Sequence, residues 1–139
     1  MAGGLEIRRC VPTADAGSIA WLTEFAHDDD RPPPRAAGMA AELTSRPGRG
    51  VESWLALRAG SPVGLVALVS ADAGAGVRHS VAWLFVGRGE RRRGIATALV
   101  ATALQSARDR GAAEVWVETR SDWPAATGFW AAIGFRPAG

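Results

Sequence analysis

An apolar strand that leads through a glycine- and arginine-rich loop straight into an amphipathic helix constrains this sequence more than any other feature. Residues Arg78–Val86 become apolar in their second half, which predicts a strand that is buried there. Across Ile95–Arg110, apolar side chains recur every four positions, so one face of a predicted helix is buried. Gly111 follows as the helix stop. This strand–loop–helix unit requires a layered domain in which the helix packs on a sheet.

The rest of the chain supplies further elements of the same two kinds. Strands are predicted at Leu5–Arg9, Val51–Arg58, Val63–Ser70 and Val115–Thr119, with a turn at Gly60–Pro62 and a loop over Ala71–Gly76. Helices are predicted at 14–27, at Arg35–Ser45 and from Pro124 to a stop at Gly134. The order βααβββαβα indicates the α/β class with a mixed sheet. A length of 139 residues predicts a single domain over 1–139.

Composition and charge exclude several classes of protein. The formal net charge of +2 argues against a nucleic-acid-binding protein. All basic residues are Arg, and Lys, Asn and Tyr are absent, which predicts a high-GC bacterial genome because those three have AT-rich codons. Cys10 is the one cysteine, so no internal disulfide forms. Met1–Cys10 has no signal-peptide pattern and the apolar runs are short, so we expect a cytoplasmic protein without a membrane partner.

The loop before the predicted helix Ile95–Arg110 has the properties of an anion site. Three arginines and Gly94 precede the helix where a Ser, Thr, Asp or Asn cap is usual, so its first N–H groups lack a side-chain acceptor. The helix dipole and the guanidiniums favour a phosphate or pyrophosphate there. Neither a Walker A loop nor a dinucleotide fingerprint matches. The alternative is an arginine-rich turn in solvent.

Two motifs in register make the chain resemble the GNAT N-acetyltransferase superfamily. Arg91, Gly94 and Ala96 occupy the family's Arg/Gln-x-x-Gly-x-Gly/Ala loop, and Leu84–Val86 match the strand before it. The second motif, Ala-x-x-Phe/Leu-Tyr-x-x-x-Gly-Phe, is matched by Ala126, Phe129, Trp130, Gly134 and Phe135, with Trp in the Tyr slot. The specific resemblance covers residues 78–136.

The resemblance implies a fold, a cosubstrate and a reaction. The fold would be a GNAT-like mixed, mostly antiparallel central sheet flanked by helices and splayed between the fourth and fifth strands. Acetyl-CoA would be the cosubstrate, without a metal, and a primary amine of a small molecule would attack it directly in a ternary complex. The implied acetyl-CoA contacts are Leu84, Phe85, Val86, Arg91, Arg92, Arg93, Gly94, Ile95, Ala96, Thr97, Phe129 and Trp130.

The chain departs from the family pattern at the base, at the acid and at its end. Ser80 stands where the family often has a Glu that acts as the general base. The amine proton would therefore pass to another group: Glu118, which we favour, or His79, Asp122 or Asp28–Asp30. The non-catalytic alternatives are that Glu118 is a strand carboxylate in solvent and that His79 is a hydrogen-bonded histidine at a strand edge. Trp130 replaces the usual acidic Tyr, so CoA would leave as the thiolate or take a proton from water or Ser121. Family members usually continue with one more strand after the Gly-Phe motif, and here that strand is either absent, supplied by a partner or cut from this sequence. An uncovered sheet edge would favour a homodimer.

The acceptor site is the least constrained part of the sequence. Asp28, Asp29 and Asp30 precede a proline run and would attract an ammonium group, with Trp83 among the tryptophans that would line the acceptor pocket. The alternatives are a solvated acidic helix end and tryptophans in the core. A rival function is a non-catalytic module that binds CoA or acyl-CoA, which the missing Glu and Tyr favour. Nucleic-acid binding by Arg88–Arg93 is a third hypothesis, which the low net charge opposes.

Overall fold

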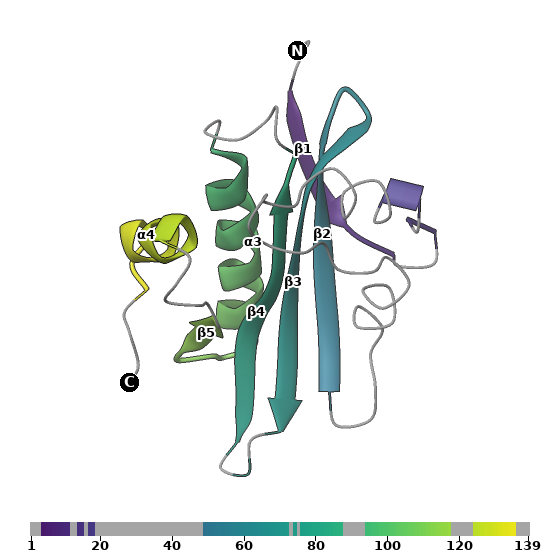
Figure 1. Cartoon of the computed structure of the whole chain (residues 1–139). Coiled ribbons are helices and arrows are strands. Elements are labelled where there is room, and N and C mark those ends of the chain that lie inside the picture. The colour runs from purple at the N-terminus through teal and green to yellow at the C-terminus, as the bar shows by residue number, and fades with distance from the viewer. Residues whose placement is uncertain are drawn as a thin grey trace.

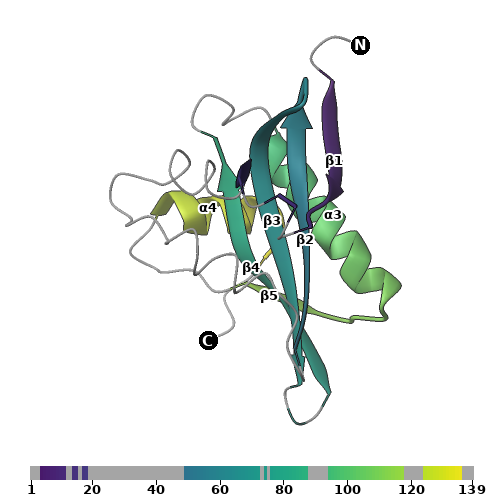
Figure 2. The ribbon, with the colours of Figure 1, turned by 90° about the vertical axis from the view of Figure 1, so that its right-hand side faces the viewer.

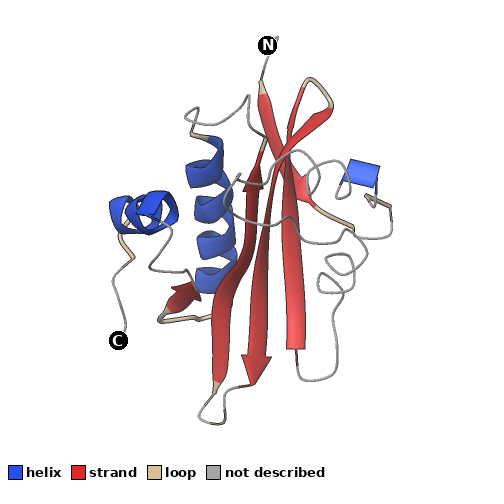
Figure 3. Cartoon of the chain, viewed as in Figure 1, coloured by secondary structure: helices blue, strands red, loops and turns tan. Residues whose placement is uncertain are grey.

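A five-stranded sheet and two helices make up the part of the chain that can be described (Figures 1 and 3). The computed structural model describes residues 4–11, 14–15, 17–18, 49–72, 74, 76–87, 94–117 and 124–135. The strands are β1 (Leu5–Arg9), β2 (Arg49–Arg58), β3 (Ser61–Asp72), β4 (Val77–Val86) and β5 (Val115–Val117), and the helices are α3 (Ile95–Asp109) and α4 (Pro124–Ala132). The helices predicted over 14–27 and Arg35–Ser45 lie outside the described residues, apart from a few at the start of the first.

The sheet has the order β1-β2-β3-β4-β5 and is mixed, as predicted. The first four strands pair antiparallel, whereas β5 pairs parallel to β4. Within the described residues, β5 pairs only with His79–Val81, while β4 continues to Val86. The described pairing thus covers the first half of β4. The splay expected between the fourth and fifth strands stays a prediction, because residues 118–123, which follow β5, lie outside the described residues.

The hairpin between β2 and β3 is tighter than the sequence suggested. Arg58 pairs with Ser61, so the turn consists of Ala59 and Gly60, not of Gly60–Pro62, and β3 begins at Ser61. Both turn residues have positive φ, 51° and 82°, as two-residue hairpin turns that match strand twist require. Strand β3 also runs on to Asp72, so the predicted loop over Ala71–Gly76 was wrong by two residues at its start.

The main core lies between α3 and one face of the sheet (Figure 2). The four residues predicted to line the buried face of α3 are each at most 1% exposed: Ile95, Leu99, Ala103 and Ala107. They pack with Trp54, Val66, Leu68 and Val81 from three strands. Leu55 and Leu65 alternate with these residues and are also 0% exposed, so the sheet is buried on both faces. Burial on both faces accounts for the long apolar runs of β2 and β3.

Both helices end in the same glycine-dependent motif. Gly111 has φ +83° and donates to Arg108 O, and Ala112 donates to Ala107 O, which is a Schellman motif. At the end of α4, Gly134 has φ +105°, and Phe135 donates to Trp130 O at 2.9 Å. The predicted helix stops at Gly111 and Gly134 are thus confirmed. No helix among the described residues is long and apolar enough to cross a membrane.

Candidate active site

Among the described residues, no side chain caps the helix start at the junction between β4 and α3. Gly94 occupies the N-cap position with φ +76° and ψ 6°, a left-handed conformation that favours glycine. It makes no side-chain cap hydrogen bond, and the first turn of α3 contains no acidic residue. Ala98 N donates to Gly94 O at 3.0 Å, so the N–H groups of residues 95–97 precede the first intrahelical hydrogen bond.

The start of α3 is held in place by burial on one side and open on the other. Ile95 is 1% exposed and anchors the first turn in the core, whereas Gly94 and Thr97 are exposed and Ala96 is half-buried. A positive dipole end whose first amides have no acceptor among the described residues can bind an anion. Arg91, Arg92 and Arg93, predicted to add positive charge, lie outside the described residues.

Strand β4 changes its alternation just before the segment predicted to bind the cosubstrate. Leu68 pairs with Val81 and Ala67 with Trp83, so Ala82 is an extra residue and forms a β-bulge. After the bulge, Leu84 and Val86 are half-buried against the core under α3. Trp83 and Phe85 belong to the strand, but their side chains are not among the described ones.

The two β4 residues considered for catalysis lie on opposite faces of the sheet. His79 is 7% exposed, on the α3 side with Val81, and its Nδ1 lies 2.7 Å from the Ser70 hydroxyl oxygen. Ser80 is half-buried on the other face, opposite Trp116 of β5. The predicted hydrogen bond of His79 is therefore present. The expected strand-edge position is wrong, because β4 lies between β3 and β5.

Helix α4 brings three aromatic rings together. Trp130 is 9% exposed and belongs to the core, with edge-to-face contacts to Phe129 at 5.0 Å and Phe135 at 5.3 Å between centroids. The Trp130–Phe135 contact joins the residues that the Schellman motif brings together, where an apolar contact is usual. The Gly-Phe pair of the second motif therefore ends the helix and packs Trp130.

The remaining predicted site residues fall outside the described part of the chain. They are Glu118, Ser121, Asp122, Asp28, Asp29 and Asp30. Within the described residues, no group of three or more His, Cys, Asp or Glu side chains is placed to hold a metal ion.

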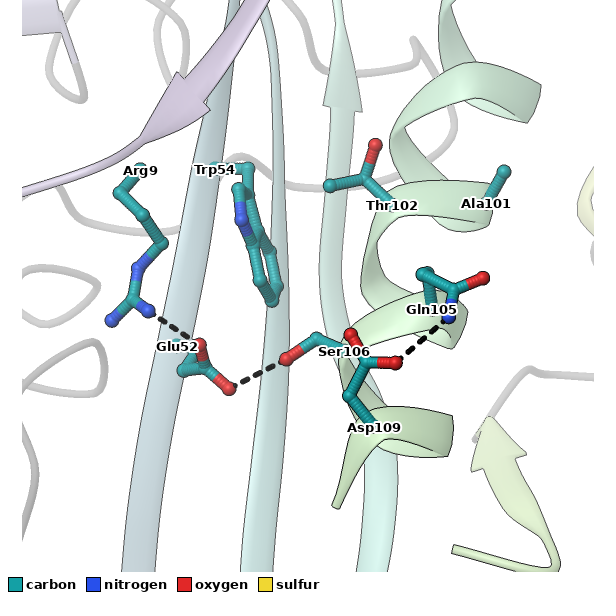
Figure 4. Close-up of a pocket in the computed structure, with 8 residues that line it drawn as sticks. All are labelled: Arg9, Glu52, Trp54, Ala101, Thr102, Gln105, Ser106 and Asp109. Atoms are coloured by element: carbon teal, nitrogen blue, oxygen red, sulfur yellow. Dashed lines mark hydrogen bonds and ion pairs between the residues drawn. The ribbon is translucent and has the colours of Figure 1, made fainter. Parts of the chain in front are cut away.

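A groove of about 520 Å³ lies at the other edge of the sheet, between α3 and strands β1 and β2 (Figure 4). Its lining is Arg9, Glu52, Trp54, Ala101, Thr102, Gln105, Ser106 and Asp109. Glu52 is 8% exposed, accepts a hydrogen bond from the Ser106 hydroxyl at 2.8 Å and forms ion pairs with Arg9 and Arg110. Sequence reasoning missed this cluster, because Glu52 lies 43 and 54 positions from Arg9 and Ser106.

The groove lies beside β1 and β2, whereas the β4–α3 junction begins two strands further along the sheet. The buried carboxylate of the groove, Glu52, already has Arg9, Arg110 and the Ser106 hydroxyl as partners. Glu52 joins β1, β2 and the last turn of α3. We therefore attribute the cluster to the stability of the fold.

Comparison with known proteins identifies one family. A family model described as the acetyltransferase (GNAT) family matches residues 16–135. No curated protein sequence matches the chain significantly.

Solved structures share the fold at low sequence identity. An aminoglycoside N-acetyltransferase in complex with CoA has a TM-score of 0.78 at 17% identity, covering 100% of this chain and 92% of that one. A ribosomal-protein-alanine N-acetyltransferase from Brucella melitensis biovar Abortus 2308 has a TM-score of 0.74 at 19% identity, with 98% and 95% covered. A transcriptional regulator from Bacillus halodurans C-125 gives the same four values. At these identities the likeness establishes the fold alone.

Proposed function

The chain belongs to the acetyltransferase (GNAT) family, and we propose that it moves an acetyl group from acetyl-CoA to the primary amine of a small molecule. The observation that carries this proposal is the start of α3 at Gly94, which has no side-chain cap among the described residues and is the next element along the chain after the bulged strand β4. The proposed single domain spans 1–139.

The pyrophosphate of acetyl-CoA is proposed to bind the N–H groups at the start of α3. Support comes from the left-handed Gly94, the exposed Thr97 and the absence of acidic residues in the first turn. A carboxylate there would compete with the anion, and a side-chain cap would occupy the same amides. The arginines of Arg91–Arg93, outside the described residues, would add charge-assisted hydrogen bonds to the pyrophosphate.

The pantetheine arm is proposed to lie along residues 84–86 of β4, with Phe129 and Trp130 as the wall. Support comes from the resemblance and from the position of this segment, which follows the β-bulge of β4 and leads toward the start of α3. An extended ligand chain can pair with strand backbone in the way that an added strand does. A main-chain N–H of this segment would then polarise the thioester carbonyl.

The acetyl transfer is proposed to be a direct attack in a ternary complex. The amine nitrogen forms a bond to the thioester carbon, the carbon–sulfur bond breaks, and the CoA sulfur leaves as a thiolate. The amine proton passes to a base, for which Glu118 remains our preferred residue. His79 is a weaker candidate for the base, because its ring is buried against Ser70 on the α3 side of the sheet. Ser80, which stands where the family often has its base, is on the opposite face.

A non-catalytic CoA-binding or regulatory module is the second candidate function. The specific observation in its favour is Trp130, which stands in the slot of the family's acidic Tyr and is packed between Phe129 and Phe135. An indole in this position has no acidic proton to give to the leaving thiolate. Proton donation typically contributes about 10²–10⁴ in rate, so the loss slows the reaction without abolishing it.

The experiment that tests acetyl-CoA binding compares Gly94→Glu with Gly111→Glu by calorimetry. Both glycines are exposed, have φ near +80°, and leave open space around an added Cβ. The two variants therefore carry the same backbone strain and the same added charge, at opposite ends of α3. We expect Gly94→Glu to abolish acetyl-CoA binding and Gly111→Glu to retain it. Equal affinity in the two variants would rule out the proposed pyrophosphate site.

A further inference from the structure

Arg78 and Trp116 lie beside Ser80 on the sheet face opposite α3. Arg78 and Ser80 are two positions apart on β4, so their side chains project from the same face. Trp116 is the register partner of Ser80 on β5, while Val81 belongs to the core under α3. Ser80, which stands where the resemblance implies that the family often has its base, thus shares one surface with these two side chains.

The Arg78 guanidinium is held over an aromatic ring and is not neutralised by a described residue. Its Cζ lies 4.5 Å from the centroid of the Trp116 ring, and the Arg78 side chain is exposed. Glu114, just before β5, is also exposed, yet no described carboxylate forms an ion pair with Arg78. When a guanidinium stacks with its flat face on an aromatic ring, the N–H groups at its rim can still donate hydrogen bonds to a carboxylate.

We propose that Arg78 is a specificity residue that binds a carboxylate on the acceptor. The acceptor is therefore an amine that also carries a carboxylate, such as a short peptide, and not a polyamine. This inference rests on the proposed function, because it takes the reacting amine to lie near Ser80. Two residues of a strand span about 7 Å, which sets the separation between the amine and the carboxylate.

Charge decides between these two classes of acceptor. A second ammonium placed near Arg78 would meet a like charge, whereas a carboxylate would meet a donor fork that the Trp116 ring already holds in place. Arg78 is exposed, so water and salt screen the interaction. We therefore expect a preference of about fivefold, the upper end for an exposed charge pair.

The test compares glycylglycine with glycylglycinamide, which offer the same amine with and without the carboxylate. In the wild type we expect the KM of the free acid to be about fivefold lower, with similar kcat values. Arg78→Ala should bring the ratio of the two KM values to about one, and Arg78→Lys should keep part of the preference. Arg108→Ala removes an exposed arginine from the last turn of α3 and should keep the wild-type ratio.

Calorimetry of both dipeptides on protein saturated with CoA separates this inference from the proposed function. Preferred binding of the free acid that Arg78→Ala abolishes supports the inference, even if no amine is acetylated and the proposed function fails. Equal binding of the two dipeptides to the wild type overturns the inference, whatever the turnover. A preference that persists in Arg78→Ala, or disappears in Arg108→Ala, also overturns it.

Discussion

The structure around Glu52 predicts that removing both Arg9 and Arg110 destabilises the protein more than removing the charge of Glu52 itself. The Glu52 side chain is 10% exposed, whereas the side chains of Arg9 and Arg110 are 59% and 42% exposed. The three charges therefore respond differently to the loss of a partner. An arginine left alone turns to water, but a carboxylate left alone stays buried.

These exposed fractions set the magnitudes. Glu52→Gln keeps the volume and an acceptor for Ser106, and it gives up two screened ion pairs, each worth at most about 1 kcal/mol. We expect this variant to lose about 1–2 kcal/mol of unfolding free energy. Arg9→Ala with Arg110→Ala leaves Glu52 with the Ser106 hydroxyl as its described donor. The expected loss is about 3 kcal/mol, the low end for a broken buried pair, because water gains access.

Urea unfolding of four proteins measures the prediction: wild type, Glu52→Gln, the double arginine variant and the triple variant. In the background without both arginines, Glu52→Gln should be neutral or stabilising, because it removes an unpaired buried charge. The reasoning is refuted if Glu52→Gln is the more destabilising change, or if it lowers stability further in the double variant.

Three further predictions concern two groups near β1. Arg8 donates two hydrogen bonds to Asp15 and holds the pKa of that carboxyl below its usual range. The ionised Asp15 therefore stabilises the fold above its unfolded-state pKa, and this contribution is lost as pH falls below about 4. The stability gap between wild type and Asp15→Asn, measured by urea unfolding, should therefore shrink as pH falls from 6 to 2; a constant gap would contradict the assignment. Burial raises the pKa of the Cys10 thiol, so iodoacetamide should label it slowly in the native protein and rapidly in urea. Cys10→Ala should leave kcat unchanged, and a lost kcat would implicate the thiol in the reaction.

Patterns confined to one element predicted the structure well. The four-residue spacing of Ile95, Leu99, Ala103 and Ala107 identified α3 and its buried face, because a helix repeats its surface at that period. Gly94 was predicted to precede the helix, and it occupies the N-cap position of α3. The turn after β2 was misplaced, because Ala59 adopts a positive φ that its sequence gives no reason to expect.

Contacts between distant parts of the chain were not accessible from the sequence. Glu52 looks like an ordinary charged residue of an alternating strand, and only its partners on β1 and α3 explain its burial. His79 and Ser80 are neighbours in sequence, yet one faces Ser70 under α3 and the other faces Trp116. Which face carries the chemistry depends on where α3 packs, and this depends on the whole sheet.

Release of free CoA thiol from acetyl-CoA in the presence of primary amines tests the central claim most directly. The wild type should release thiol at a rate that depends on the amine, and Gly94→Glu should release none while Gly111→Glu retains the activity. Tight binding of CoA by the wild type, with thiol release unchanged by any amine, would contradict an acetyltransferase and indicate a CoA-binding module.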